Sequence, residues 1–183
     1  VLLLGVTAGL TAHELGTTRV VLRMAPADTY TVTITTDAAA LLEKLESVGG
    51  VTAEVPEAAG LLEARLRAQA ATFASRVSLT FDGETAAPQV DIRVSADTPE
   101  APPAAVVTLR GHAPADAEHF AWSYGWAFAS YALTAEAGRG AADATVWLDG
   151  TTTSGPLPLP RADTGAAAPS WLATARQYLV LGF

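Results

Sequence analysis

Aromatic side chains at every second position of one segment constrain this fold more than any other feature of the sequence. Five of them alternate with small residues: Phe120, Trp122, Tyr124, Trp126 and Phe128. A repeat of two residues is typical of a β-strand with one buried face, because successive side chains of a strand point to opposite sides. Gly125 interrupts the run, so we expect two strands, 119–124 and 130–135, joined by a turn around Trp126.

We expect this aromatic face to form the centre of a hydrophobic core, in which Phe120 and Trp122 meet Tyr131 and Leu133. Each large aromatic side chain removes about 150–250 Å² from water when it is buried, so a few of them can hold a small β domain together. The alternative is an exposed platform for carbohydrate or membrane, since Trp and Tyr also suit such interfaces.

Other short runs of β-branched residues, separated by Pro, Gly and Asp, also predict strands. These further strands are expected at 19–23, 29–35, 76–81, 89–96, 105–110 and 144–148. Helical patterns occur at 38–47, with Asp37 as the N-cap, and at 57–75, with Pro56 at its start. The pattern predicts a mainly β fold with a helical insertion, in the form of an antiparallel, immunoglobulin-like β-sandwich.

The composition narrows the classes of protein to which the chain can belong. A length of 183 residues suits one domain with a core of its own. The formal net charge is −8, whereas nucleic-acid binding needs clustered Lys and Arg, so we expect no nucleic-acid partner. The sequence has no cysteine, which excludes disulfides, thiolate metal sites and a Cys nucleophile.

Both ends of the sequence are apolar. Residues 1–12 read VLLLGVTAGLTA and end in small residues, which is typical of a signal peptide, although a buried first strand is the alternative. Residues 171–183 place Trp, Leu, Ala and Tyr at helical spacing, and we expect them to begin a transmembrane helix. We therefore expect a signal-peptide remnant at 1–12, an extracytoplasmic domain at 13–160, a linker at 161–170 and the start of a transmembrane region at 171–183.

Several short motifs lie outside the helical insertion. They are Ala12-His13-Glu14, Phe81-Asp82-Gly83, Pro114, Phe120-Ala121-Trp122, Ser130-Tyr131-Ala132-Leu133, Trp147-Leu148-Asp149-Gly150, Pro156-Leu157-Pro158-Leu159 and Tyr178-Leu179-Val180-Leu181-Gly182-Phe183. In these motifs the chain resembles the amino-terminal extracytoplasmic region of the HupE/UreJ family of bacterial membrane proteins, in its signal-peptide-bearing branch. The resemblance implies a membrane protein with a nickel-type metal-transport role. The histidine and aspartate motif associated with transport in that family is absent from this sequence.

Three histidines are the candidate metal ligands: His13, His112 and His119. Imidazole is a common ligand for Ni, Cu and Zn. Cleavage after Ala12 would give His13 a free α-amine beside its ring, and Asp116 and Glu118 could add oxygens near the other two. The alternative is that these residues are solvated parts of loops, and we expect no resident cofactor beyond a possible nickel or other divalent ion.

No pattern in the sequence predicts a catalytic residue. Paired carboxylates need enclosure to separate their pKa values, and the acidic residues here fall in turns and on helix faces. Neither Ser123 nor Ser154 fits the G-x-S-x-G pattern of a nucleophile elbow. We therefore expect a protein that is not an enzyme, and a cryptic hydrolase is the third reading.

The preferred interpretation is a non-catalytic domain of an integral membrane protein, displayed on the extracytoplasmic side of the cell membrane. Its expected role is assembly, gating or partner binding, and its expected partners are its own transmembrane region, the lipid bilayer and a further protein. The alternative is a periplasmic metal-binding module that delivers an ion to the membrane part.

Overall fold

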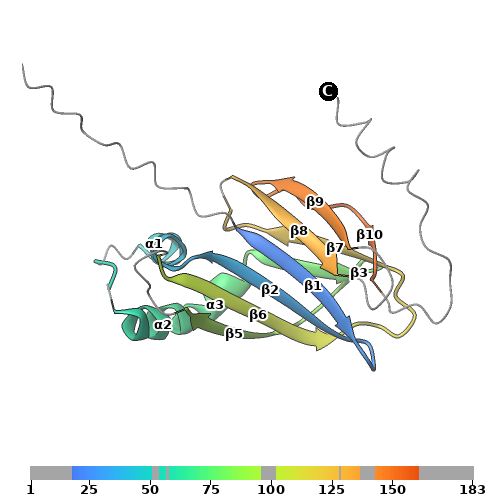
Figure 1. The fold of residues 1–183 in the computed structure, drawn as a ribbon, viewed down its shortest axis with the longest axis horizontal. Coiled ribbons are helices and arrows are strands. Elements are labelled where there is room, and N and C mark those ends of the chain that lie inside the picture. The colour runs from blue at the N-terminus through green and yellow to red at the C-terminus, as the bar shows by residue number, and fades with distance from the viewer. Residues whose placement is uncertain are drawn as a thin grey trace, which may run out of the picture.

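The computed structural model describes residues 18–50, 54–56, 58–95, 102–127, 129–136 and 143–160. Over these residues the fold is mainly β, with ten strands in two sheets and three helices (Figure 1). The predicted fold class, mainly β with a helical insertion, is confirmed at this level. The helices gather at one end of the molecule, on the left in Figure 1.

The elements follow one another in an order that alternates between the two sheets. They are β1 (Arg19–Ala25), β2 (Thr29–Asp37), α1 (Ala38–Val48), α2 (Ala59–Ala68), α3 (Ala70–Ala74), β3 (Val77–Phe81), β4 (Glu84–Thr85), β5 (Gln89–Val94), β6 (Ala104–His112), β7 (His119–Tyr124), β8 (Ser130–Glu136), β9 (Ala144–Asp149) and β10 (Leu157–Pro158). The six-stranded sheet has the order β5-β6-β2-β1-β8-β9, and the four-stranded sheet has the order β10-β7-β3-β4. Every longer strand was predicted from the sequence to within a few residues, whereas the two-residue strands β4 and β10 were not predicted.

One strand pair departs from the predicted antiparallel arrangement. Strands β1 and β8 are parallel, with Arg19 opposite Ala132 and Arg23 opposite Glu136. The other strand pairs within the described ranges are antiparallel. Hairpin turns impose the antiparallel direction on strands that are neighbours in sequence. No such turn links β1 to β8, because the chain passes through the helices and the other sheet between them, so the prediction was wrong at this pair.

Helix α1 begins where the sequence predicts. The Asp37 carboxylate accepts a hydrogen bond from the Ala40 N–H at 2.7 Å, which satisfies one of the free donors of the first turn. The single helix predicted at 57–75 is instead two helices, α2 and α3, which meet at Gln69 (φ −95°, ψ 11°). The Phe73 carbonyl of α3 accepts a hydrogen bond from the Trp126 indole N–H at 2.8 Å. This contact joins α3 to a segment far away in the sequence, so the local helical pattern could not indicate it.

Strand β7 also ends where expected, at a close approach of two backbones. The Gly125 N–H donates to the Arg76 carbonyl at 2.7 Å. A Cβ atom at position 125 would lie 2.9 Å from the Arg76 Cβ, so glycine is needed here for space.

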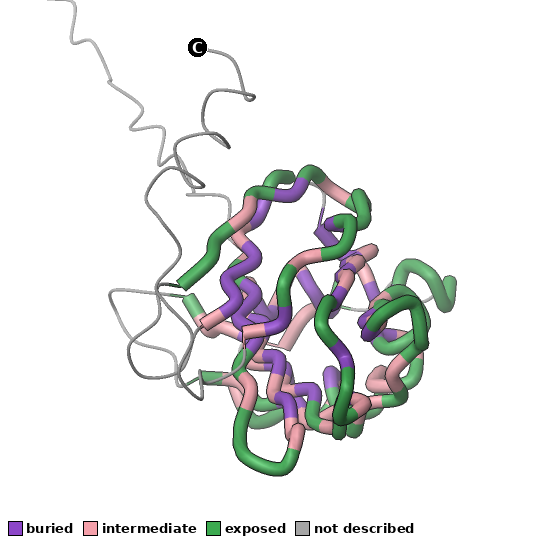
Figure 2. The backbone as a smooth tube through the Cα atoms, turned by 90° about the vertical axis from the view of Figure 1, so that its right-hand side faces the viewer, coloured by how far each residue is buried: buried purple, intermediate pink, exposed green. Residues whose placement is uncertain are grey.

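The two sheets and the helices share one hydrophobic core. Buried residues alternate with more exposed ones along the strands, as the purple segments of Figure 2 show. Four residues of the predicted aromatic face are buried: Phe120, Trp122, Tyr124 and Trp126. Tyr131 and Leu133 of β8 pack in the same cluster, so the predicted core is confirmed and the exposed platform is excluded for these residues. Phe128 lies outside the described residues.

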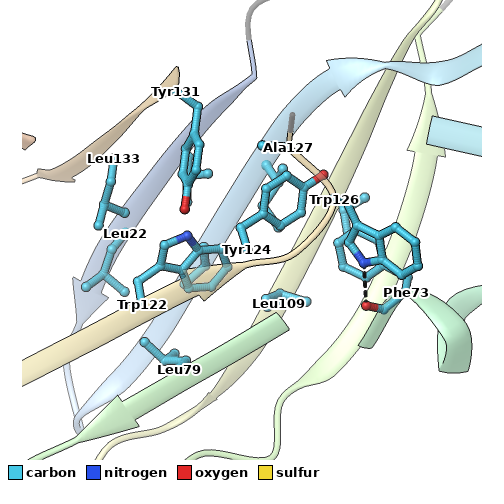
Figure 3. Packing of buried hydrophobic residues seen from close by; sticks show 14 of the residues in the cluster. Leu22, Phe73, Leu79, Leu109, Trp122, Tyr124, Trp126, Ala127, Tyr131 and Leu133 are labelled. Atoms are coloured by element: carbon cyan, nitrogen blue, oxygen red, sulfur yellow. Dashed lines mark hydrogen bonds between the residues drawn. The ribbon is translucent and has the colours of Figure 1, made fainter. Parts of the chain in front are cut away.

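Tyr124 lies at the centre of the aromatic cluster (Figure 3). Its ring stacks near Trp122 at 6.3 Å between centroids and meets the edge of Tyr131 at 5.7 Å. Phe73 of α3 lies 6.1 Å away on another side. The Trp122 indole nitrogen and the Tyr131 hydroxyl point toward each other in Figure 3, although neither has a hydrogen-bond partner of good geometry. Burial raises the pKa of Tyr131 to about 12, so this phenol stays neutral at ordinary pH.

The expectations for the ends of the chain lie outside the described residues. These are the signal-peptide remnant at 1–12, the linker at 161–170 and the membrane helix start at 171–183. Among the helices that the structure does describe, none has the length and apolar character needed to cross a bilayer.

The first prediction tests the aromatic core. Replacing Trp122, of which 1% is exposed, by Ala should lower the free energy of unfolding by about 3–5 kcal/mol, the usual cost of removing a large buried aromatic. Trp122→Phe should cost less, because it keeps most of the apolar volume and removes the unpaired indole N–H. Urea denaturation followed by circular dichroism measures both. An unchanged midpoint for Trp122→Ala would contradict the core assignment.

A second prediction tests which face of α2 meets the core. Leu61 and Leu62 are adjacent, but 63% of Leu61 is exposed and only 2% of Leu62. Leu62→Ala should lower the free energy of unfolding by about 2–5 kcal/mol, whereas Leu61→Ala should change it by less than about 0.5 kcal/mol. Equal effects of the two substitutions in thermal denaturation would contradict the orientation of this helix.

Candidate functional site

The structure places the two described candidate histidines in different sheets. His112 ends β6 in the six-stranded sheet, and His119 begins β7 in the four-stranded sheet. Both side chains are exposed. The third candidate, His13, lies outside the described residues. In the described part of the chain, no three His, Cys, Asp or Glu side chains converge in a way that could hold a metal ion.

His112 lies beside the turn between β1 and β2. Its Nδ1 is 3.5 Å from the Thr29 hydroxyl and 3.4 Å from the Ala27 carbonyl oxygen. Both distances are long for hydrogen bonds. The described neighbours of this imidazole nitrogen are therefore one hydroxyl and one backbone oxygen of a hairpin, and neither is a side chain that typically binds Ni or Zn.

His119 has an acidic neighbour. Its Nδ1 lies 3.5 Å from Oδ1 of Asp82, which comes from the turn between β3 and β4. Asp82 and Gly83 both have positive φ angles, 46° and 89°, as the central residues of a two-residue hairpin turn of the primed type do. The Asp-Gly pair that marks this turn in the sequence therefore brings a carboxylate beside the start of β7.

The main partners of the Asp82 carboxylate are backbone groups. Its two oxygens accept hydrogen bonds from the N–H groups of Glu118 and His119, each at 2.9 Å. In return, the Asp82 N–H donates to the His119 carbonyl at 3.1 Å. The Glu118 N–H, followed by smaller effects of His119, holds the pKa of Asp82 below its ordinary value, because hydrogen bonds to the charged form stabilise it. The sequence placed Asp82 in a turn but carried no sign of this second role.

A shallow hollow lies against the same residues. Its volume is about 260 Å³, and it is lined by Thr80, Asp82, Gly83, His119, Phe120, Ala121 and Pro156. Pockets for small molecules usually occupy about 300–1,000 Å³, so this hollow is below that range. About half of the His119 side chain and 44% of the Asp82 side chain are exposed, so the hollow does not enclose its polar groups.

The Asp82–His119 pair offers few of the groups that catalysis or metal binding requires. A histidine beside an aspartate can act as a general base when a nucleophile lies within hydrogen-bond reach of the imidazole. The described contacts of His119 include no hydroxyl within that reach. A metal ion would find two side-chain ligands, whereas protein zinc sites use three or four. What the described contacts do provide is a clamp: Asp82 ties the connection between β6 and β7 to the β3–β4 turn.

Ser154, which does not fit a nucleophile elbow in the sequence, has contacts within the fold. Its hydroxyl oxygen accepts a hydrogen bond from the Trp122 N–H at 3.0 Å, and the hydroxyl donates to the Gly155 carbonyl at 2.8 Å. The Ser154 N–H donates to the Trp122 carbonyl at 2.9 Å. This residue thus pairs with β7 in the manner of a neighbouring strand just before β10 begins.

Two charged groups that the sequence reading did not single out connect the helices to the rest of the fold. Lys44 donates from Nζ to the Trp126 carbonyl at 2.9 Å, and burial lowers the pKa of this amine while Asp37 acts in the opposite direction. Glu46, which is buried, accepts two hydrogen bonds from one guanidinium nitrogen of Arg65 and so joins α1 to α2. A buried ion pair of this kind is costly to break, because the remaining charge is left without a partner.

The third prediction concerns the Asp82 clamp. Because the folded pKa is depressed, its stabilisation is complete above the ordinary carboxyl pKa near 4 and is lost as the pH falls through the lower folded value. Asp82→Asn keeps the size of the side chain and tolerates the positive φ, but it cannot accept both hydrogen bonds. The variant should have a lower Tm than the wild type at pH 7, and the difference should shrink as the pH falls below about 4.

Asp116→Asn is the matched control, since Asp116 is an exposed carboxylate in the connection that Asp82 holds. Thermal denaturation from pH 3 to pH 7 gives the comparison. A Tm difference between Asp82→Asn and the wild type that stays constant over this range would contradict the role of the ionised carboxylate.

Comparisons with family models, with curated proteins and with solved structures returned no match. The functional reading therefore rests on the residues of this chain and on the resemblance stated from its motifs.

Proposed function

We propose that this chain contains a non-catalytic domain of an integral membrane protein, displayed on the extracytoplasmic side and acting in assembly, gating or partner binding. The proposal follows the resemblance to the HupE/UreJ family, whose members are associated with nickel-type transport. In this reading the domain supports a transport region that lies elsewhere in the protein.

The single observation that carries the proposal is the structural role of the residues in which the resemblance lies. Phe81 and Phe120 are opposite each other on β3 and β7, and both are buried. Leu157 of β10 is opposite Phe120 on the other side. Motif residues that pack in the core support a display domain, whereas a catalytic domain would need polar groups that converge on one site.

The polar members of the same motifs support this reading. The Asp82 carboxylate is occupied by two backbone N–H groups, and the Asp149 carboxylate accepts a hydrogen bond from the Ser130 hydroxyl at 2.5 Å. Each of these acidic groups holds a turn or a strand end.

We also propose that the fold is an immunoglobulin-like sandwich. Two sheets that pack on one shared core support an immunoglobulin-like sandwich, in which the inner faces of both sheets contribute apolar side chains. Such domains commonly present their loops and edges to partners. Membrane attachment through residues 171–183 stays a prediction from the sequence.

The metal-delivery alternative draws less support from the geometry. His112 and His119 are in different sheets, and the polar contacts of each are to a hairpin or to one carboxylate. A delivery site needs several ligands that converge, with second-shell groups that orient them.

The fourth prediction tests the location of the domain. The 183 residues contain no cysteine, so a single thiol introduced among them is the only one in this part of the protein. Thr152→Cys lies in an exposed turn after β9, and in spheroplasts of a bacterial host it should react with a membrane-impermeant maleimide. The labelled protein should sediment with the membrane fraction.

Ala105→Cys serves as the matched control, because position 105 is fully buried in β6 and should react only after denaturation. Labelling of Thr152→Cys only after the spheroplasts are lysed would contradict the extracytoplasmic location. Recovery of the labelled protein in the supernatant after ultracentrifugation would contradict attachment to the membrane.

A further inference from the structure

The two open sheets have four edges, and the structure treats one of them differently from the rest. An edge strand presents unpaired N–H and C=O groups, which can pair with a strand from another chain. Native proteins usually block this pairing with short strands, prolines, charged side chains or a covering helix. The edges here are β5 and β9 in the six-stranded sheet, and β4 and β10 in the four-stranded sheet.

Strand β5 is blocked by side chains of α2. Arg67 donates from Nε to the Ile92 carbonyl at 2.8 Å, and Glu63 accepts a hydrogen bond from the Val94 N–H at 2.9 Å. These backbone groups face away from β6, so they are the ones that a new strand would need. The ion pair between Arg67 and Glu63 at 3.0 Å holds both side chains in place.

The edges of the four-stranded sheet are blocked by length and by proline. Strand β4 has two residues, Glu84 and Thr85. Strand β10 also has two, and Pro158 is one of them, with Pro156 just before the strand. A strand of two residues is too short to offer a continuous row of hydrogen-bonding groups. In β10 the row is further interrupted because proline has no N–H to donate.

Strand β9 lacks these protections. It has six residues, Ala144–Asp149, and contains no proline, lysine or arginine. Among the described residues it pairs with β8 alone. Trp147 on this strand has 71% of its surface exposed, the largest fraction among the exposed large hydrophobic residues of the described chain. A long, apolar edge with an exposed tryptophan has the features of an interface, since Trp is enriched among residues that dominate binding energies.

We propose that β9 pairs with β9 of a second copy of this chain, so that the two six-stranded sheets join edge to edge in a symmetric dimer. This inference rests on the proposed assembly function and names the partner through which the domain acts. A two-fold axis makes the same surface patch serve both subunits, which requires that the strand be complementary to itself in the antiparallel direction.

The sequence of β9 meets this requirement. Thr145 and Trp147 are on the outer face of the sheet, opposite Thr134 and Ala132 of β8, while Leu148 is on the core face opposite Tyr131. An antiparallel pair centred on Trp147 keeps the two faces in register, because directly opposite residues lie on the same face.

In that register Trp147 meets its own counterpart on the outer face, and Val146 meets Leu148 of the other copy on the core face. Thr145 lies opposite Asp149 of the other copy, so no two acidic side chains of the strand face each other. Aromatic pairs and apolar pairs opposite each other are the contacts that stabilise strand pairing. The strand therefore matches a second copy of itself in apolar character and in charge.

The test uses single cysteines, since the natural chain has none. In the proposed register the two Trp147→Cys residues are directly opposite, within the 4.4–6.8 Å between Cα atoms, roughly, that a disulfide requires. Thr145→Cys is on the same strand and the same face, but its two copies would be about 13 Å apart, because strands rise about 3.3 Å per residue. Mild oxidation of the 183-residue chain should therefore crosslink Trp147→Cys, but not Thr145→Cys, on a non-reducing gel.

Association of the chain without introduced cysteines is measured separately by sedimentation velocity over a range of protein concentrations, in a non-ionic detergent that keeps the apolar ends apart. The chain should form dimers, and Trp147→Arg should weaken the association by about tenfold or more, as the loss of an aromatic anchor does. Leu61→Arg, a substitution of another exposed apolar residue on α2, should leave it unchanged. Circular dichroism checks that each variant is folded.

A monomer at all concentrations would overturn the proposal, as would crosslinking of Thr145→Cys in preference to Trp147→Cys. Equal weakening by Trp147→Arg and Leu61→Arg would also overturn it. The maleimide labelling of Thr152→Cys reports the location of the domain independently of pairing. If the chain does not dimerise but Thr152→Cys is labelled as expected, only the proposed interface is rejected. If Thr152→Cys is not labelled as expected, the proposed location is rejected.

Discussion

The packing around Tyr124 is the contact on which the rest of the structure depends. Its ring touches the three parts of the fold at once: Trp122 on its own strand, Tyr131 in the other sheet and Phe73 in the helical insertion. An aromatic side chain that is fully buried contributes apolar burial and specific ring geometry together. The sheets are held face to face, and α3 is held against them, because these rings share one space.

Around this core, polar side chains mainly hold the connections between strands. Asp82 holds the approach to β7, Ser154 pairs with the middle of β7, and the Glu46–Arg65 pair joins the first two helices. Each contact satisfies a backbone group or a charge that would otherwise be left without a partner.

The edges of the two sheets differ in how well they are protected against pairing with another chain. Helix α2 covers the β5 edge with an arginine and a glutamate, and proline limits the β10 edge, while β9 keeps its hydrogen-bonding groups and presents Trp147. Among the described residues three of the four sheet edges are blocked, which leaves β9 as the edge at which a sheet could be extended. A domain with one such edge is suited to pairing with one partner, and an open chain of associating copies is avoided.

The sequence by itself determined where the longer strands and helix α1 form. The alternation of apolar residues in β2 and β7 and the Asp37 cap are local signals, because a period of two residues or a side-chain cap involves neighbours in the chain. The Asp-Gly turn after Phe81 is local in the same sense.

Only the tertiary structure decided which strands became neighbours and what the turn residues contact. The parallel pairing of β1 with β8, the bond from Trp126 to the Phe73 carbonyl and the bonds to Asp82 from Glu118 and His119 all join segments far apart in the sequence. Their free energy comes from the shared core and from backbone groups that find partners only once the chain has folded, so no pattern within either segment carries that information.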